Sequence, residues 1–101
     1  MITFPAFPEY DDVLTIPDGW IDVSYCNNAC PNISHAFGED HRISIYCDYK
    51  DASKRADGQG CVYRFIVIVE DGIGEEYRGC FCQFDDAVMF ANALIKQEYT
   101  K

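Results

Sequence analysis

The sequence predicts an α+β fold, in which an antiparallel four-stranded meander sheet carries one C-terminal helix on one face. Two patterns predict it: four segments have the patterning of strands, by alternation of apolar and polar residues or by apolar character on both sides, and apolar residues recur at helical spacing near the C-terminus. The 101 residues are 49% hydrophobic and 25% charged, which fits one folded domain. We expect residues 20–101 to form that domain and residues 1–19 to form an irregular N-terminal arm packed on it.

The first part of the chain is predicted to hold one strand between two irregular segments. Pro5, Pro8 and Pro17 interrupt the arm, because proline cannot donate to a ladder of backbone hydrogen bonds. Residues 20–25 alternate and predict a strand whose buried side carries Ile21, Val23 and Tyr25. Residues 26–38 contain three Asn, one Pro and one Gly, and this composition predicts a long loop.

Two further strands are predicted in the middle of the chain. Residues 41–49 alternate, which places Ile43, Ile45 and Cys47 on one face and leaves the other face solvated. Residues 61–70 are apolar on both sides, as expected of a strand inside the sheet.

The last strand and the helix complete the fold. Residues 71–74 (Asp-Gly-Ile-Gly) predict a tight reversal into a fourth strand over residues 75–84. In that strand we expect Tyr77, Gly79 and Phe81 to share one face. A helix is then predicted from Ala87 to about Tyr99, with Asp85 as its N-cap.

The charge and the apolar runs limit the classes of partner and compartment. Seventeen acidic residues against eight basic ones give a net charge of −9, which argues against nucleic acid or an anionic membrane as a direct ligand. No apolar run approaches the length of a membrane span, and no signal peptide is recognisable at the N-terminus. We therefore expect a cytoplasmic protein of a bacterial host cell, in which the six cysteines are mostly reduced.

The cysteines and histidines do not form a recognisable metal or catalytic motif. Structural zinc sites commonly use Cys-x2-Cys pairs, whereas Cys26 and Cys30 are separated by three residues. Cys30 lies near His35 in sequence, but no third group marks a nucleophile with its base and orienting partner. We predict no catalytic residue, no metal and no cofactor, with Cys26 and Cys30 as the one pair worth testing for metal.

Clustered carboxylates predict a binding site instead. Glu70, Asp71, Glu75 and Glu76 fall within seven residues and are expected to meet at one end of the sheet. The arm adds the doublet Asp11-Asp12, so the predicted partner-binding residues are these six carboxylates. Exposed aromatic residues would add apolar contacts to such a surface, and the sequence offers four candidates for this role: Tyr10, Trp20, Tyr46 and Tyr77.

In length, charge and sheet-plus-helix pattern the chain resembles, as a class, the small acidic phage and mobile-element proteins that inhibit host defence, the anti-CRISPR and anti-restriction inhibitors. The resemblance implies a non-enzymatic inhibitor that occupies a basic protein surface of a bacterial nucleic-acid-binding complex. Two alternatives stay open: a small zinc or redox domain built on the cysteines, and an immunity-type partner of a toxin. The sequence leaves the oligomeric state open.

Overall fold

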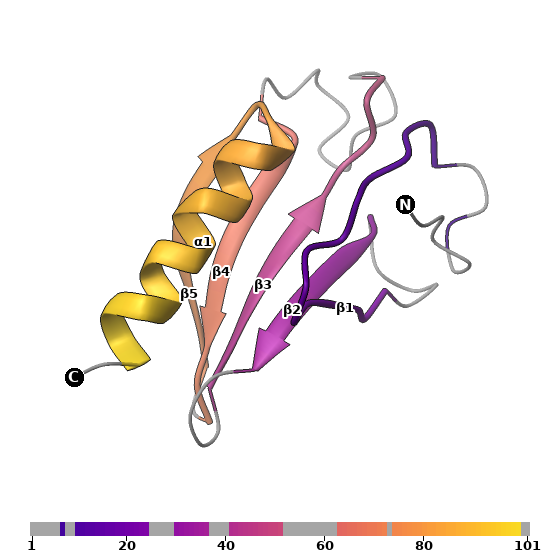
Figure 1. The fold of residues 1–101 in the computed structure, drawn as a ribbon. Coiled ribbons are helices and arrows are strands. Elements are labelled where there is room, and N and C mark those ends of the chain that lie inside the picture. The colour runs from indigo at the N-terminus through magenta and orange to yellow at the C-terminus, as the bar shows by residue number, and fades with distance from the viewer. Residues whose placement is uncertain are drawn as a thin grey trace.

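The computed structural model describes residues 7, 10–24, 30–36, 41–51, 63–72 and 74–99, and it has an α+β architecture (Figure 1). One antiparallel sheet holds the strands in chain order, and a C-terminal helix lies across it. The elements are β1 (Ile21–Asp22), β2 (Asn32–Ala36), β3 (Arg42–Cys47), β4 (Phe65–Glu70), β5 (Glu75–Phe81) and α1 (Phe84–Tyr99). The predicted α+β meander with a C-terminal helix is confirmed, but the sheet has five strands and not four.

The extra strand arises where the sequence predicted a loop. β2 lies within residues 26–38 and pairs along its whole length with β3. The predicted first strand shrinks to the two residues of β1 at the sheet edge. Its predicted buried side is wrong, because Ile21 is 63% exposed while Trp20 is buried. Tyr25 and the cysteine Cys26 lie outside the described residues.

β3 and β4 form the interior of the sheet. Ile43, Ile45 and Cys47 are fully buried on one face of β3, as the alternation predicts. The opposite face of β3 is not fully solvated, because Ser44 is buried against Ser34 of β2 with their hydroxyl oxygens 2.7 Å apart. β4 lies between β3 and β5, which confirms its predicted place inside the sheet.

β5 contains a bulge that the alternation cannot reveal. The register with β4 shifts between Val67 and Ile68, so Val67 pairs with Gly79 whereas Ile68 pairs with Tyr77. The extra residue turns Tyr77 to the face opposite Gly79. The prediction that both side chains share a face is therefore wrong. β5 also ends at Phe81, earlier than the predicted residue 84.

The helix begins earlier than its apolar spacing predicts. α1 starts at Phe84, and Ala87 N–H donates to the Gln83 carbonyl oxygen at 3.2 Å. Asp85 is therefore inside the first turn and is not the N-cap. Asp85 and Asp86 still suit the positive end of the helix dipole.

The core lies between the sheet and the layer that covers one of its faces. α1 buries Ala87, Ala91 and Leu94 against β3, β4 and β5. The arm segment covers the β2 side, where Trp20 packs edge-on against the ring of His35 and its indole N–H donates to Asn92 of the helix. Two described arm residues also belong to the core cluster, Phe7 and Leu14.

The side of the sheet opposite α1 is termed the open face; Ser34 and Ser44 are buried on it. The register with the neighbouring strands also places five apolar or aromatic side chains there: Tyr46, Ile66, Ile68, Tyr77 and Cys80. Four of them are half-buried, and Tyr77 is 60% exposed.

Candidate binding surface

The β4–β5 hairpin gathers four carboxylates at one end of the sheet. This acidic turn consists of Glu70 at the end of β4, Asp71 in the turn, and Glu75 and Glu76 at the start of β5. Glu70 and Glu75 are paired across the two strands and lie on the open-face side. The helix also ends toward this end of the sheet, so its negative pole adds to the negative potential there (Figure 1).

Two arginines neutralise part of the acidic turn. Arg42 of β3 donates to one carboxylate oxygen of Glu70 from Nη2 at 2.8 Å and from Nε at 3.1 Å. Arg78 lies 3.6 Å from a carboxylate oxygen of Glu76. These two guanidinium groups pair with Glu70 and Glu76, two of the four carboxylates of the turn. Glu75 is exposed and makes no hydrogen bond or ion pair with another described residue.

Asp71 shapes the turn itself. Its backbone N–H donates to the Gly74 carbonyl oxygen at 3.0 Å, and its carboxylate accepts from the Gly74 N–H at 2.9 Å. The two bonds close the reversal that joins β4 to β5. They hold Glu70 and Glu75 side by side, which is the arrangement that the sequence predicts for this cluster.

Asp11 and Asp12 do not join the other four carboxylates. Asp12 pairs with Arg64 at 3.1 Å, just before β4 begins, whereas Glu70 ends that strand. The length of β4 separates these ends by about 20 Å. Asp11 accepts hydrogen bonds from the backbone N–H groups of Lys50 and Asp51, both at 2.8 Å. The structure thus gives this doublet roles in fixing the arm and the end of β3.

The open face continues directly from the acidic turn. Burial, and then the negative charges of Glu75 and Glu70, raise the pKa of Tyr46. The phenol of Tyr46 therefore lies close enough to feel both carboxylates. Beyond it, Ile66 and Ile68 extend the apolar surface to the exposed ring of Tyr77. Carboxylates and aromatic side chains form one continuous surface.

The other two aromatic candidates have structural roles. Trp20 is buried in the core and bonded to the helix. The Tyr10 hydroxyl donates to the Asp48 carbonyl oxygen at 3.0 Å and accepts from Arg64. Of the four aromatics considered from sequence, only Tyr46 and Tyr77 lie on the open face.

Cys30 and Cys47 are poor candidates for metal binding or nucleophilic chemistry. Burial, and then the charge of Asp48, raises the pKa of Cys30 to about 12, and burial also raises the pKa of Cys47. Both thiols therefore stay protonated near neutral pH, whereas a thiolate is the form that attacks or binds metal. The described residues contain no group of three or more His, Cys, Asp or Glu side chains arranged to hold a metal ion.

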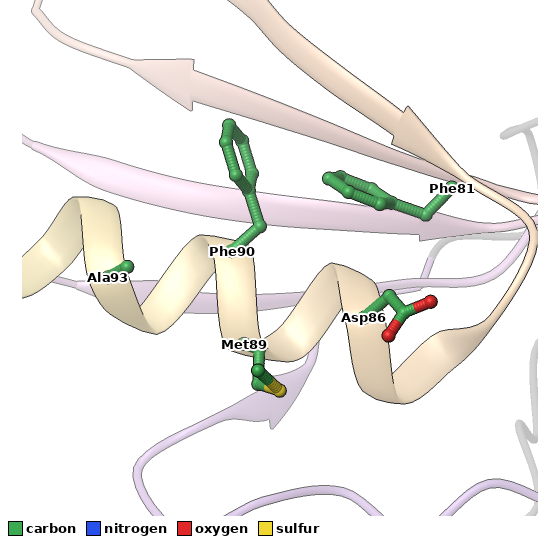
Figure 2. A pocket seen from close by; sticks show the side chains of 5 residues that line it. All are labelled: Phe81, Asp86, Met89, Phe90 and Ala93. Atoms are coloured by element: carbon green, nitrogen blue, oxygen red, sulfur yellow. The ribbon is translucent and has the colours of Figure 1, made fainter.

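A groove between β5 and α1 is a feature that the sequence reading missed (Figure 2). Its volume is about 450 Å³, and its lining residues are Phe81, Asp86, Met89, Phe90 and Ala93. On the helix these residues are spaced three and four apart, so they form a second stripe beside the buried one. That spacing is the signal that could have revealed the groove.

No family model, no curated protein and no solved structure matches this chain. In the described part of the chain, no helix combines the length and the apolar character needed to cross a membrane. Inference about function therefore starts from the surfaces described above.

Proposed function

We propose that this chain is a non-enzymatic binding protein that inhibits a bacterial nucleic-acid-handling complex by occupying a basic protein surface. The observation that carries the proposal is the continuity of the acidic turn with the open face. The exposed carboxylate of Glu75 and the exposed ring of Tyr77 share one side of the sheet with half-buried apolar side chains of β3 and β4.

The two parts of this surface suit different steps of binding. Exposed carboxylates such as Glu75 attract a basic partner over a distance and orient it, which mainly raises the association rate. The apolar side chains then supply affinity, because tyrosine and aliphatic side chains gain most when water is excluded around them. Glu75 and Tyr77 are exposed and two residues apart on β5, so one partner can contact both.

The charge pattern supports a protein partner over a nucleic acid. Binding to phosphates requires clustered lysine and arginine side chains. Arg42 and Arg64 are each paired with a carboxylate. A basic protein surface that normally holds nucleic acid has the complementary charge, and its occupation would block the nucleic acid directly.

The proposal is tested by affinity capture from bacterial lysate, read by mass spectrometry at low and high salt. The baits are the wild-type protein, Glu75→Lys and a matched control, Asp85→Lys, which makes the same charge change at the far end of β5. We expect the wild type and the control to retain one basic nucleic-acid-handling complex at low salt, and Glu75→Lys to lose it. Equal retention by all three baits would rule out the acidic turn as the binding site.

The apolar part of the surface has its own variant. Tyr77→Ala is expected to weaken capture at every salt concentration by about tenfold, because a desolvated aromatic contact is not screened by ions. Val13→Ala is the matched control, since Val13 is 52% exposed on the arm. Loss of capture with both variants, or with neither, would contradict a specific role of the open face.

A further inference from the structure

We propose that the groove between β5 and α1 is a binding site for an arginine side chain of a protein partner. The groove lies on the helix side of the sheet, and none of its lining residues belongs to the open face or the acidic turn. The proposal rests on the proposed function only for the source of the arginine, a basic protein. The site itself is argued from its lining.

The walls of the groove are aromatic and aliphatic. The rings of Phe81 and Phe90 have centroids 5.1 Å apart and are tilted by 48°. Phe90 reaches from the helix toward Phe81 of the strand, with Asp86 one turn earlier on the helix (Figure 2). Met89 lies on the outer wall and is 72% exposed, although it is a large apolar side chain.

Gly79 has no side chain to occupy the space on the strand side of the groove. A Cβ atom at this position would lie 3.3 Å from the rings of both Phe81 and Phe90. A residue with a Cβ atom would require the neighbouring rings to shift by a few tenths of an ångström. Glycine at position 79 thus lets the rings of Phe81 and Phe90 lie close to the strand backbone.

Asp86 determines the kind of side chain that fits. Among the described lining residues it is the one that carries a charge, and no described cation pairs with its carboxylate. A side chain that suits this site has an apolar stem to lie on the rings and a cationic tip to reach the carboxylate. Arginine suits it better than lysine, because the planar guanidinium stacks on aromatic rings and is weakly hydrated.

An arginine, a phenylalanine ring and an aspartate already meet elsewhere in this protein. The guanidinium carbon of Arg64 lies 4.7 Å from the centroid of the Phe65 ring. The same guanidinium pairs with the Asp12 carboxylate at 3.1 Å. The fold thus holds one arginine between a phenylalanine ring and an aspartate, and the groove offers the ring and the aspartate without the arginine.

The test uses the ε-methyl signal of Met89 in protein labelled with [methyl-¹³C]methionine. The chain has two methionines, so Met1 gives the only other signal and Met89→Leu assigns both. The probes are N-acetyl-arginine amide, its neutral isostere N-acetyl-citrulline amide, and N-acetyl-norleucine amide. We expect the arginine probe to shift the Met89 signal with a dissociation constant about three- to fivefold lower than that of citrulline.

Two variants separate a specific ion pair from general attraction to an acidic protein. Asp86→Asn is expected to make the dissociation constants of the arginine and citrulline probes equal. Asp85→Asn removes the same charge one residue away and should keep the preference for the arginine probe. An equal response to arginine and citrulline in the wild type would overturn the proposal. So would stronger binding of norleucine, or no shift of Met89 with any probe. These results are independent of Glu75, so failure here leaves the acidic turn to be judged by its own experiment.

Discussion

At the scale of single residues, Arg64 makes the densest set of contacts described in the protein. Its guanidinium donates to Asp12, to the Tyr10 hydroxyl and twice to the Asp48 carbonyl oxygen, and it also stacks on Phe65. Only 12% of its side chain is exposed. One side chain therefore ties the arm to the end of β3 and the start of β4.

Replacing Arg64 is expected to lower the free energy of unfolding far more than replacing Arg42, which pairs with Glu70 of the neighbouring strand. Arg64→Met removes the hydrogen bonds to Asp12, to the Tyr10 hydroxyl and to the Asp48 carbonyl oxygen, so we expect a loss of about 2 kcal/mol or more. Arg42→Met removes an ion pair whose arginine is 52% exposed, and we expect a loss of at most about 1 kcal/mol. Urea unfolding followed by fluorescence of the single, buried Trp20 measures both. Similar losses would contradict the structural role assigned to Arg64.

At the scale of elements, β2 shows how a polar segment becomes a buried strand. Ile33 is the only large aliphatic residue of the five and it enters the core, while Ser34 faces Ser44 across the ladder. Both serines are 1% exposed, and their hydroxyls satisfy one another. The pair allows polar residues in the middle of the sheet at little cost.

The serine pair predicts a non-additive pattern of stabilities. Ser34→Ala or Ser44→Ala alone leaves a buried hydroxyl without its partner, at a cost of about 1 kcal/mol or more. The double variant removes both hydroxyls and is expected to be closer to the wild type than the two losses added together. Urea unfolding of the four proteins gives the coupling energy. Strictly additive losses would show that the hydroxyls do not depend on each other.

The elements also show what sequence patterns can and cannot reveal. β3 and α1 were predictable because their apolar residues repeat with periods of two and 3.6, and β4 because it is a short, continuous apolar run. β2 was not, since the buried Ser34 depends on a partner ten residues away. The place of Tyr77 on the open face depends on the bulge in β5, which leaves no mark in the alternation. The sequence could predict that the carboxylates of the acidic turn cluster. It could not predict that the charges of Glu75 and Glu70 act on Tyr46 of another strand.

The edge formed by β5 bears on how partners bind. An open edge strand can pair with a strand of another chain. Here the bulge breaks the ladder after Val67, and charged residues occupy the first half of the strand. These features disfavour pairing along β5. Both proposed sites accordingly use side chains beside this edge, Tyr77 on one face and Phe81 on the other.

At the scale of the whole molecule, the net charge of −9 destabilises the compact state through self-repulsion, and it also attracts a basic partner. The fold places the carboxylates at separate ends: the acidic turn at one end of β4, and Asp12 with Arg64 at the other. Any further ionisation adds negative charge to this excess. High pH is therefore the condition under which the whole fold is expected to fail.

Two buried thiols determine the pH at which the stability of the fold begins to decline. Burial raises the pKa of Cys30 from 9.0 to about 12 and also raises that of Cys47, so both stay protonated in the folded protein when the unfolded chain has lost both protons. Their contribution to stability is full below about pH 9 and is lost as the pH rises above it. Each thiol contributes a slope of roughly 1.4 kcal/mol per pH unit in that window.

Urea unfolding under reducing conditions, between about pH 7 and about pH 10, measures this decline. Cys47→Ala is expected to be less stable than the wild type at neutral pH, because it leaves a cavity in the core, but to lose stability less steeply above pH 9. Cys82→Ala is the matched control, because Cys82 is exposed and its removal should leave the slope unchanged. An equally steep decline in Cys47→Ala and in the wild type would mean that the core thiols do not govern alkaline unfolding.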